Sequence, residues 1–433
     1  MTPLPVIDQV RARQERDIVL SIRRKLKTAD LVLRESDKGG NLYVGRTSYF
    51  AQKAAEYRTK TGAYEQLSSN PIEEMLARVT RLLNDLHMKT KEINAKQYKE
   101  MMPSRSKVEL AYMYFNPKTH KEPMSLRPIM NTIHASTRGI SHLLDRLIRP
   151  LFDRHARPRP IVDSGHLLRQ LEQYAHAGHL KPSTLFCTFD ITNLYTMLPQ
   201  DESLDILEEF LRAHHYVHVQ GITIKTLRRL AEVVLKETVF VDGNQFYRQI
   251  IGGAMGSPFT LTLANIFMWK WERSTMATTL GPNEIYGRSV IDTHGMDERN
   301  GSFVHFVRSF FSSSCFSYID DVFFTSNESK ANVEALLLRA NCFHPNIKLE
   351  ASIGQCVTFL DLLVSNNHGT LSSSVYHKPA AEPCVVPFMS DHPRHVFANV
   401  VRAALVRAVR YSSTLDTFHK ERRAIRLMLL YNG

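Results

Sequence analysis

Three aspartates stand where apolar strands would otherwise continue, and this feature most restricts how the chain can fold. Asp190 comes at the end of the apolar segment Leu185–Ile191, and the pair Asp320 and Asp321 interrupts the apolar segment Phe316–Phe324. Buried carboxylates repel one another unless a cation or a proton lies between them. If the two segments lie side by side, their acids converge at a shared end, where a cation could bind them. The alternative is that Asp320 and Asp321 form only a surface turn, where Asp is common.

If the strands are neighbours, the converging carboxylate oxygens suit Mg²⁺, a hard cation that keeps waters and binds substrate phosphates. A pair of such ions could activate a 3′-hydroxyl and stabilise a pyrophosphate leaving group. Tyr-x-Asp-Asp alone is a weak signal, so the interpretation depends on the rest of the sequence.

The net charge and the absence of long apolar segments limit the kinds of partner that the protein can bind. The 433 residues carry a formal net charge of +12, which predicts an anionic partner, either nucleic acid or an anionic membrane surface. No apolar run is long enough for a membrane span, and the N-terminus lacks an export signal, so we expect no membrane partner. The 5 cysteines are scattered without a Cys-x-x-Cys pair, which favours a reducing, intracellular compartment.

Helical and strand patterns alternate irregularly, which favours an α/β or α+β fold over a helical bundle. Residues 274–302 lack periodicity and predict an inserted loop. Helices are predicted over residues 7–27, 48–57, 72–87, 94–102, 202–212, 258–271, 396–411 and 418–430. Strands are predicted over residues 31–34, 42–44, 185–191, 315–319 and 322–325, with a hairpin over 239–250.

Several short stretches occur in one order along the chain. They are Phe115-Asn116-Pro117-Lys118-Thr119-His120-Lys121 with Leu126-Arg127-Pro128-Ile129, Phe189-Asp190-Ile191-Thr192-Asn193-Leu194-Tyr195, Gln249-Ile250-Ile251-Gly252-Gly253-Ala254-Met255-Gly256-Ser257-Pro258, Tyr318-Ile319-Asp320-Asp321 and Phe359-Leu360-Asp361. Together they resemble the successive motifs of a reverse transcriptase. With the upstream Asp37-Lys38-Gly39, they resemble most narrowly the Penelope-like retroelement branch, relatives of telomerase.

The resemblance implies an α+β, right-hand polymerase whose palm is an antiparallel sheet backed by helices. The implied domains are a mostly helical N-terminal region over 1–105, fingers over 106–183, a palm over 184–365 with the loop insertion near 274–302, and a basic helical thumb over 366–433. No Gly-Ile-Tyr plus Tyr-Ile-Gly nuclease pattern follows the thumb. We therefore expect a truncated copy, or a member of the branch that lacks the nuclease and primes on existing DNA ends.

The resemblance also assigns residues to the metal. Asp190, Asp320 and Asp321 are the expected catalytic acids and metal ligands, and the backbone carbonyl of Ile191 is an expected further ligand. Two Mg²⁺ ions, or Mn²⁺ in their place, are the implied cofactors.

The nucleotide site implied by the resemblance consists of Lys118, Arg127, Tyr195, Gln249, Gly252 and Lys348. A guanidinium presents a bidentate fork to phosphate oxygens, and an ammonium acts as a point charge. The aromatic ring of Tyr195 is expected to exclude a ribose 2′-hydroxyl, although a tyrosine in the core remains an alternative. A solvated basic loop is the alternative for Lys118 and Arg127, and an exposed strand lysine is the alternative for Lys348.

The implied primer and template contacts are Phe359, Leu360, Arg402, Arg407 and Arg410. Phe359 and Leu360 could equally belong to a strand core. The arginines alternate with apolar residues on a predicted helix, so one face can pack while the other follows a phosphate backbone.

The predicted function is that of an RNA-directed DNA polymerase, which extends a DNA 3′ end on an RNA template with deoxynucleoside triphosphates. The alternative is a catalytically silent or repurposed RNA- or DNA-binding protein derived from such an element. A polymerase that makes RNA is disfavoured by Tyr195. We expect the protein in the nucleus rather than the cytoplasm. The role of Asp37 to Gly40 is left open.

Overall fold

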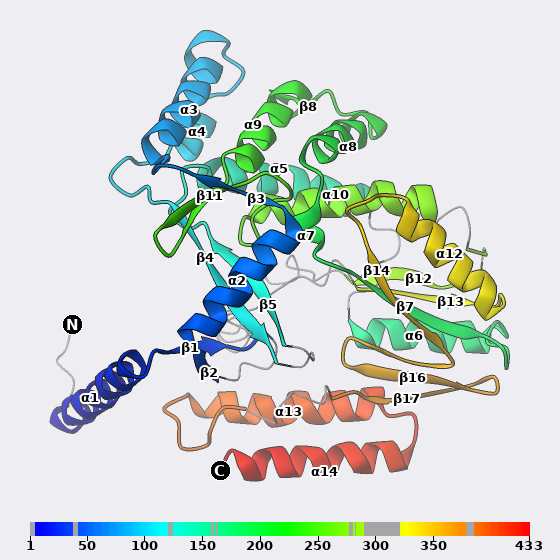
Figure 1. The fold of residues 1–433 in the computed structure, drawn as a ribbon. Helices are drawn as coiled ribbons and strands as arrows, with labels where there is room; N and C mark the ends of the chain where they lie inside the picture. The colour runs from blue at the N-terminus through cyan, green and yellow to red at the C-terminus, as the bar shows by residue number, and fades with distance from the viewer. Residues whose placement is uncertain are drawn as a thin grey trace. The chain divides into compact units, whose positions relative to one another are not determined.

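A computed structural model describes residues 5–37, 42–119, 124–156, 160–161, 163–276, 280–281, 283–289, 321–377 and 385–433. Helices and strands are both abundant in these residues, which confirms the α+β class (Figure 1). None of the described helices is long and apolar enough to cross a membrane. The chain separates into two compact units, and the predicted limits of fingers, palm and thumb stay predictions.

The described residues of the first unit lie within 1–60 and 115–128. Helix α1 matches the predicted basic helix, and none of its residues is buried. The predicted strands around Asp37 are confirmed as an antiparallel pair, β1 and β2. The elements of this unit are α1 (Val6–Thr28), β1 (Leu31–Glu35), β2 (Leu42–Arg46) and α2 (Thr47–Thr61), with the ends of β4 (Ala111–Lys118) and β5 (Ser125–Asn131) that flank residues 119–124.

The second unit consists of residues 61–114, 129–379 and 383–433. Its helices are α3 (Ile72–Asn84), the π-helix η1 (Asp85–Lys89), α4 (Ala95–Met101), α5 (Arg138–Ala156), α6 (Ser164–His176), α7 (Leu194–Met197), α8 (Gln200–Ala213), α9 (Ile224–Lys236), α10 (Pro258–Thr275), α12 (Lys330–Cys342), α13 (Arg394–Tyr411) and α14 (Leu415–Tyr431). Its further strands are β3 (Tyr64–Leu67), β6 (Pro160–Ile161), β7 (Leu185–Ile191), β8 (His218–Val219), β9 (Ile222–Thr223), β10 (Val239–Asp242), β11 (Gln245–Gln249), β12 (Tyr286–Ser289), β13 (Val322–Ser326), β14 (Leu349–Gly354), β15 (Cys356–Phe359), β16 (Leu362–Asn367) and β17 (Thr370–Val375).

The sheet that carries the acids has the strand order β14-β7-β13-β12-β6. Its first three pairs of neighbours are antiparallel, as predicted for a palm, and only the short strand β6 joins β12 in parallel. We call this sheet the palm sheet. Strand β7 coincides with the predicted apolar segment, so a long apolar run that ends near an acid was enough to locate the central strand.

The two faces of the palm sheet are buried differently because side chains alternate along each strand. Cys187, Phe189 and Ile191 of β7 belong to a large core that includes residues of α5, α8, α9 and α10. On the other face, Phe186 of β7 and Phe323 of β13 join a smaller core with α6 and with the sheet of β15, β16 and β17. The helical layer and the β16–β17 hairpin are visible beside β7 in Figure 1.

The prediction of an inserted loop over residues 274–302 is wrong for residues 286–289. These residues form strand β12, which pairs with β13 in the palm sheet. Arg288 on β12 is buried, and its Nε lies 2.8 Å from a carboxylate oxygen of Glu272 while Nη1 donates to Asn265. A strand this short, with a charged residue inside it, carries no apolar alternation that a sequence pattern can detect.

A polar network fixes the end of the palm sheet that is remote from the acids. Tyr174 donates to Glu284 at 3.0 Å, and the Asn327 side chain donates to Tyr174 and to Glu284. Burial of the Tyr174 hydroxyl, helped by the charge of Glu284, raises the pKa of Tyr174 to about 12. The network joins α6, the segment before β12 and the end of β13, so it holds the sheet against the helix beneath it.

Candidate active site

The register of the palm sheet brings the predicted acids to one end. Val322 of β13 pairs with Phe189 of β7, so Asp321 directly precedes a residue whose partner is the neighbour of Asp190. The two strands therefore end their pairing at the same place, as predicted from the interrupted apolar segments. Asp320 lies outside the described residues.

The third strand adds an acid that sequence reasoning missed. Glu350 of β14 pairs with Asp190 across the antiparallel ladder. Side chains directly opposite each other in such a ladder share a face, and like charges there are destabilising. Glu350 is exposed, Asp190 is half-buried, and Thr192 donates to Glu350 at 3.4 Å. The acids thus form a negatively charged end of one sheet face.

The acidic end is less buried than the other end of the same sheet face. Phe186 and Asp190 lie on the same side of β7, because they are separated by an even number of residues. Phe186 is fully buried in the smaller core, whereas Thr188 and Asp190 are only half-buried. Burial therefore decreases along β7, from the packed core at Phe186 to the half-buried acid Asp190.

The acids at this end of the sheet offer carboxylate oxygens, the type of ligand that a divalent cation prefers. One oxygen of Asp190, Oδ1, is buried and accepts no hydrogen bond from the described residues. A buried carboxylate oxygen without a donor is costly unless a cation satisfies it. No group of three or more His, Cys, Asp or Glu in the described part of the chain is arranged to hold a metal ion. Because Asp320 is outside that part, the two-metal site stays a prediction.

Tyr195 follows the acidic strand closely. Asn193 has a left-handed backbone with φ of 54°, which turns the chain sharply from β7 into the short helix α7. Tyr195 is 9% exposed and contacts the large core. The alternative of a core tyrosine is therefore compatible with its burial, and the predicted contact with the sugar stays a prediction.

The glycine-rich segment lies against the backbone of α7. The amide of Gly252 donates to Leu198 at 2.8 Å, and the amide of Gly253 donates to Tyr195 at 2.9 Å. Gly252 has φ of +76°, and a Cβ there would lie 2.3 Å from the carbonyl oxygen of Thr196. Only glycine allows this approach, so the structure explains why the segment that holds Gly252 next to Tyr195 contains glycine.

Gln249 is held beside the same segment. Its side chain is buried, and its Nε2 donates to the carbonyl of Ile251 at 3.0 Å. Gln200 of α8 donates to the carbonyls of Gln249 and Gly252. Three of the predicted nucleotide-site residues, Tyr195, Gln249 and Gly252, are thus brought together at the start of α7.

Lys348 immediately precedes β14, next to Thr192. The amide of Thr192 donates to the carbonyl of Lys348 at 2.8 Å, so Lys348 lies beside the acidic end of the sheet. The ammonium is exposed and donates to the carbonyl of Asn341 at 3.3 Å. This position agrees with an exposed strand lysine and with the predicted contact to pyrophosphate, so the two interpretations remain.

Phe359 and Leu360 belong to the β15–β16 turn. Phe359 is buried in the smaller core and contacts the ring of Phe323. Leu360 has φ of +55°, a left-handed conformation that bulky residues rarely adopt and that costs about 1–3 kcal/mol. Asp361 follows, and it accepts a hydrogen bond from Ser164 of α6. The predicted primer contact therefore lies on a strained turn that α6 holds in place.

Of the three arginines predicted to contact primer and template, Arg407 has carboxylate partners. Its guanidinium lies 3.7 Å from Asp361 and 3.7 Å from the buried Glu421 of α14, so it ties α13 to the β15–β16 turn and to α14. Arg402 and Arg410 are exposed on α13. Helices α13 and α14 pack side by side (orange and red in Figure 1). A groove of about 540 Å³ on α14 is lined by His419, Arg422, Arg423, Arg426, Leu427 and Leu430.

Lys118 and Arg127 lie in the first unit, at the facing ends of β4 and β5. Arg127 is paired with Asp37, whose carboxylate oxygen lies 2.7 Å from Nε of Arg127. The sequence assigned no role to Asp37. In the structure Asp37 contacts Arg127, which belongs to the predicted nucleotide site.

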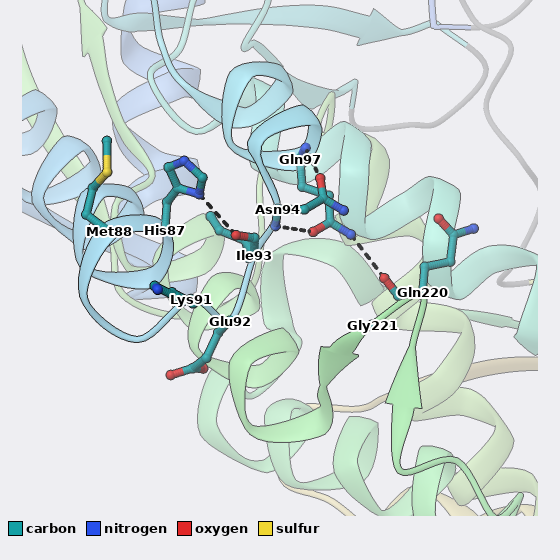
Figure 2. Close-up of a pocket in the computed structure, with 9 residues that line it drawn as sticks. All are labelled: His87, Met88, Lys91, Glu92, Ile93, Asn94, Gln97, Gln220 and Gly221. Atoms are coloured by element: carbon teal, nitrogen blue, oxygen red, sulfur yellow. Dashed lines mark hydrogen bonds between the residues drawn. The ribbon is translucent and has the colours of Figure 1, made fainter.

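One open pocket of the second unit lies apart from the predicted site residues, because none of them lines it. The pocket has a volume of about 550 Å³, and Figure 2 shows the nine residues around it. The Asn94 and Gln97 capping box of α4 forms one wall, and Gln97 also donates to the carbonyl of Gln220 at 3.1 Å. These amides stabilise the junction of α4 with the β8–β9 turn, which is a structural role.

The C-terminal region matches a family model described as an animal helix-turn-helix domain, over residues 384–433. This range contains α13 and α14. No curated protein sequence matches the chain.

Among solved structures, the chain is similar to telomerase from Candida albicans in complex with a fragment of telomeric RNA. The identity is 10%, the TM-score is 0.52, and the match covers 87% of this chain and 57% of the telomerase. It is also similar to apo telomerase from Candida tropicalis, with 10% identity, a TM-score of 0.51, and coverage of 94% and 65%. The chain thus spans less than two thirds of the length of either telomerase. At this identity the comparison concerns architecture, and the chain has a fold similar to that of these telomerases.

Proposed function

We propose that the chain is an RNA-directed DNA polymerase that extends a DNA 3′ end on an RNA template. The observation that carries the proposal is the register of the palm sheet, which aligns Asp190 with Glu350 and ends beside Asp321. A fold similar to that of telomerases supports the same class of activity. The Penelope-like assignment rests on the sequence motifs.

The acidic end supplies the chemistry expected of a nucleotidyl transferase. Asp190 and Asp321, with Asp320, would hold Mg²⁺ through carboxylate oxygens, and bound Mg²⁺ would polarise the attacking hydroxyl and neutralise charge on the phosphates. Tyr195 and the glycine segment would form the wall of the site next to the sugar of the incoming nucleotide. Lys348 would lie where a leaving pyrophosphate can accept a proton.

Binding of the nucleic acid backbone would fall to the basic C-terminal helices. Arg402 and Arg410 of α13 are exposed, as are Arg422 and Arg426 of α14. Phosphate contacts from such side chains fix the register of a duplex without reading its sequence. The match to a helix-turn-helix model over the same residues supports DNA as one ligand of this helix pair.

A nucleic-acid-binding protein without turnover is the second candidate, and the same helix-turn-helix match favours it. Primer extension distinguishes the two. Purified protein is incubated with a DNA primer annealed to an RNA template, Mg²⁺, and either deoxynucleotides or ribonucleotides. The proposal predicts extension with deoxynucleotides and little with ribonucleotides. Binding of the primer–template without extension by either would favour the second candidate, and preferential extension by ribonucleotides would indicate an RNA polymerase.

A further inference from the structure

The buried carboxylate of Asp37 forms an ion pair with Arg127, a residue of the predicted nucleotide site. Asp37 follows β1, its side chain is fully buried, and one of its oxygens lies 2.7 Å from Nε of Arg127. A buried carboxylate is stable only with a positive partner or with hydrogen-bond donors. Arg127 supplies that charge from β5, far away in the sequence.

The same residue is tied to the neighbouring strand through its backbone. The amide of Asp37 donates to the carbonyl of Pro117 at 2.9 Å. Pro117 directly precedes Lys118 on β4. Asp37 therefore binds both strands that carry the proposed triphosphate contacts, one through its amide and the other through its carboxylate.

We propose that Asp37 is a positioning residue for the incoming triphosphate and acts through Arg127, an inference that rests on the proposed polymerase function. An arginine has five N–H donors, and the contact with Asp37 engages the guanidinium at Nε. Nε is buried and contacts Asp37 as an ion pair, not as a directed hydrogen bond, while 20% of the Arg127 side chain stays accessible. The ion pair limits where the guanidinium can lie, and a guanidinium held in place can present its terminal nitrogens to phosphate oxygens as a bidentate fork.

The proposal gives Asp37, the first residue of the Asp37-Lys38-Gly39 motif, a role that the sequence left open. A partner that already orients the arginine lowers the conformational entropy that the arginine loses when it binds the nucleotide. Removal of that partner therefore weakens nucleotide binding more than it slows the bond-forming step. A purely structural ion pair would instead lower stability and leave nucleotide affinity unchanged.

The test is a double-mutant cycle on primer extension. Asp37→Asn, Arg127→Ala and the double variant are compared with the unaltered protein for kcat and for KM of the deoxynucleotide, after thermal melting confirms folding. We expect Asp37→Asn to raise KM about tenfold with a smaller change in kcat, and to add no further increase in the Arg127→Ala background. Glu100→Gln, which breaks an exposed ion pair with Arg146, is the matched control and should leave KM unchanged.

An Asp37→Asn variant that folds and keeps its KM within about twofold would overturn the inference, as would equal KM increases in the two backgrounds. If Asp37→Asn does not fold, Asp37→Glu replaces it, since it keeps the charge but displaces the carboxylate by one methylene. A raised KM in Asp37→Glu supports the inference, and an unchanged KM refutes it. Failure of the unaltered protein to extend any primer would refute the proposed function instead.

Discussion

Gly252→Ala tests the geometry of the site without touching any proposed reacting group. The substitution places a methyl group 2.3 Å from the carbonyl oxygen of Thr196, at a residue whose φ is +76°. The left-handed conformation alone costs about 1–2 kcal/mol for a residue with a Cβ. Displacing backbone that cannot move freely adds about 1–3 kcal/mol. The expected loss of unfolding free energy is therefore about 2–5 kcal/mol.

Gly243→Ala separates these two contributions. Gly243 lies in the β10–β11 turn with φ of +62°, and a Cβ there would meet nothing within 4 Å. Its expected loss is only the conformational part, about 1–2 kcal/mol. Urea denaturation of both variants, monitored by tryptophan fluorescence, measures the difference. Equal losses of unfolding free energy in the two variants would show that the glycine segment does not lie against α7. Tyr195, Gln249 and Gly252 would then not be grouped as described.

Three further predictions address the sugar, the salt dependence and the pH dependence. Tyr195→Ala should increase the ratio of ribonucleotide to deoxynucleotide kcat/KM, whereas Tyr195→Phe should preserve it because the ring remains; an unchanged ratio in an active Tyr195→Ala protein would place Tyr195 in the core only. Affinity for the primer–template should fall by about tenfold or more between about 50 and 200 mM salt, measured by fluorescence anisotropy, because phosphate contacts release counterions; binding insensitive to salt would contradict the role of the C-terminal arginines. Burial, with the charges of His155 and Arg273, lowers the pKa of His214. The unfolded chain therefore takes up this proton first, and stability is lost as the pH falls below the unfolded pKa of about 6.5. The free energy of unfolding should decrease less between pH 7 and pH 5 in His214→Phe than in the unaltered protein or in the exposed control His218→Gln, and the same decrease in all three would refute this assignment.

Local sequence patterns located the elements whose periodicity is strong. Strand β7 was predicted from seven mostly apolar residues ending near an acid, and its observed bounds, Leu185–Ile191, are the same. Helix α10 begins at Pro258 as predicted, because proline is favoured in a first helical turn. Strand β12 was missed because four residues with a buried arginine give no alternation to detect.

The neighbouring ends of β7 and β13 were predicted from their acids, but the other contacts between distant residues could not be, because they depend on strand pairing rather than on local pattern. Nothing near Glu350 in the sequence indicates that it faces Asp190, and the pairing of β14 with β7 creates that contact. The sequence shows that Arg407 is basic, but it does not show that Asp361 and Glu421 are its ion-pair partners. The motif resemblance named Arg127 and Asp37 separately, and only the fold of the first unit joins them.

The most direct test of the central claim is primer extension by Asp190→Asn on an RNA template with Mg²⁺ and deoxynucleotides. The substitution keeps the shape of the side chain and removes one charge from the acidic end of the palm sheet, so binding of the primer–template should change little. Asp205→Asn, which alters an exposed acid on α8, should extend normally. We expect Asp190→Asn to bind the primer–template with near-normal affinity and to extend it at least about a thousandfold more slowly. Extension by Asp190→Asn at a near-normal rate would contradict the assignment of Asp190 as a catalytic acid.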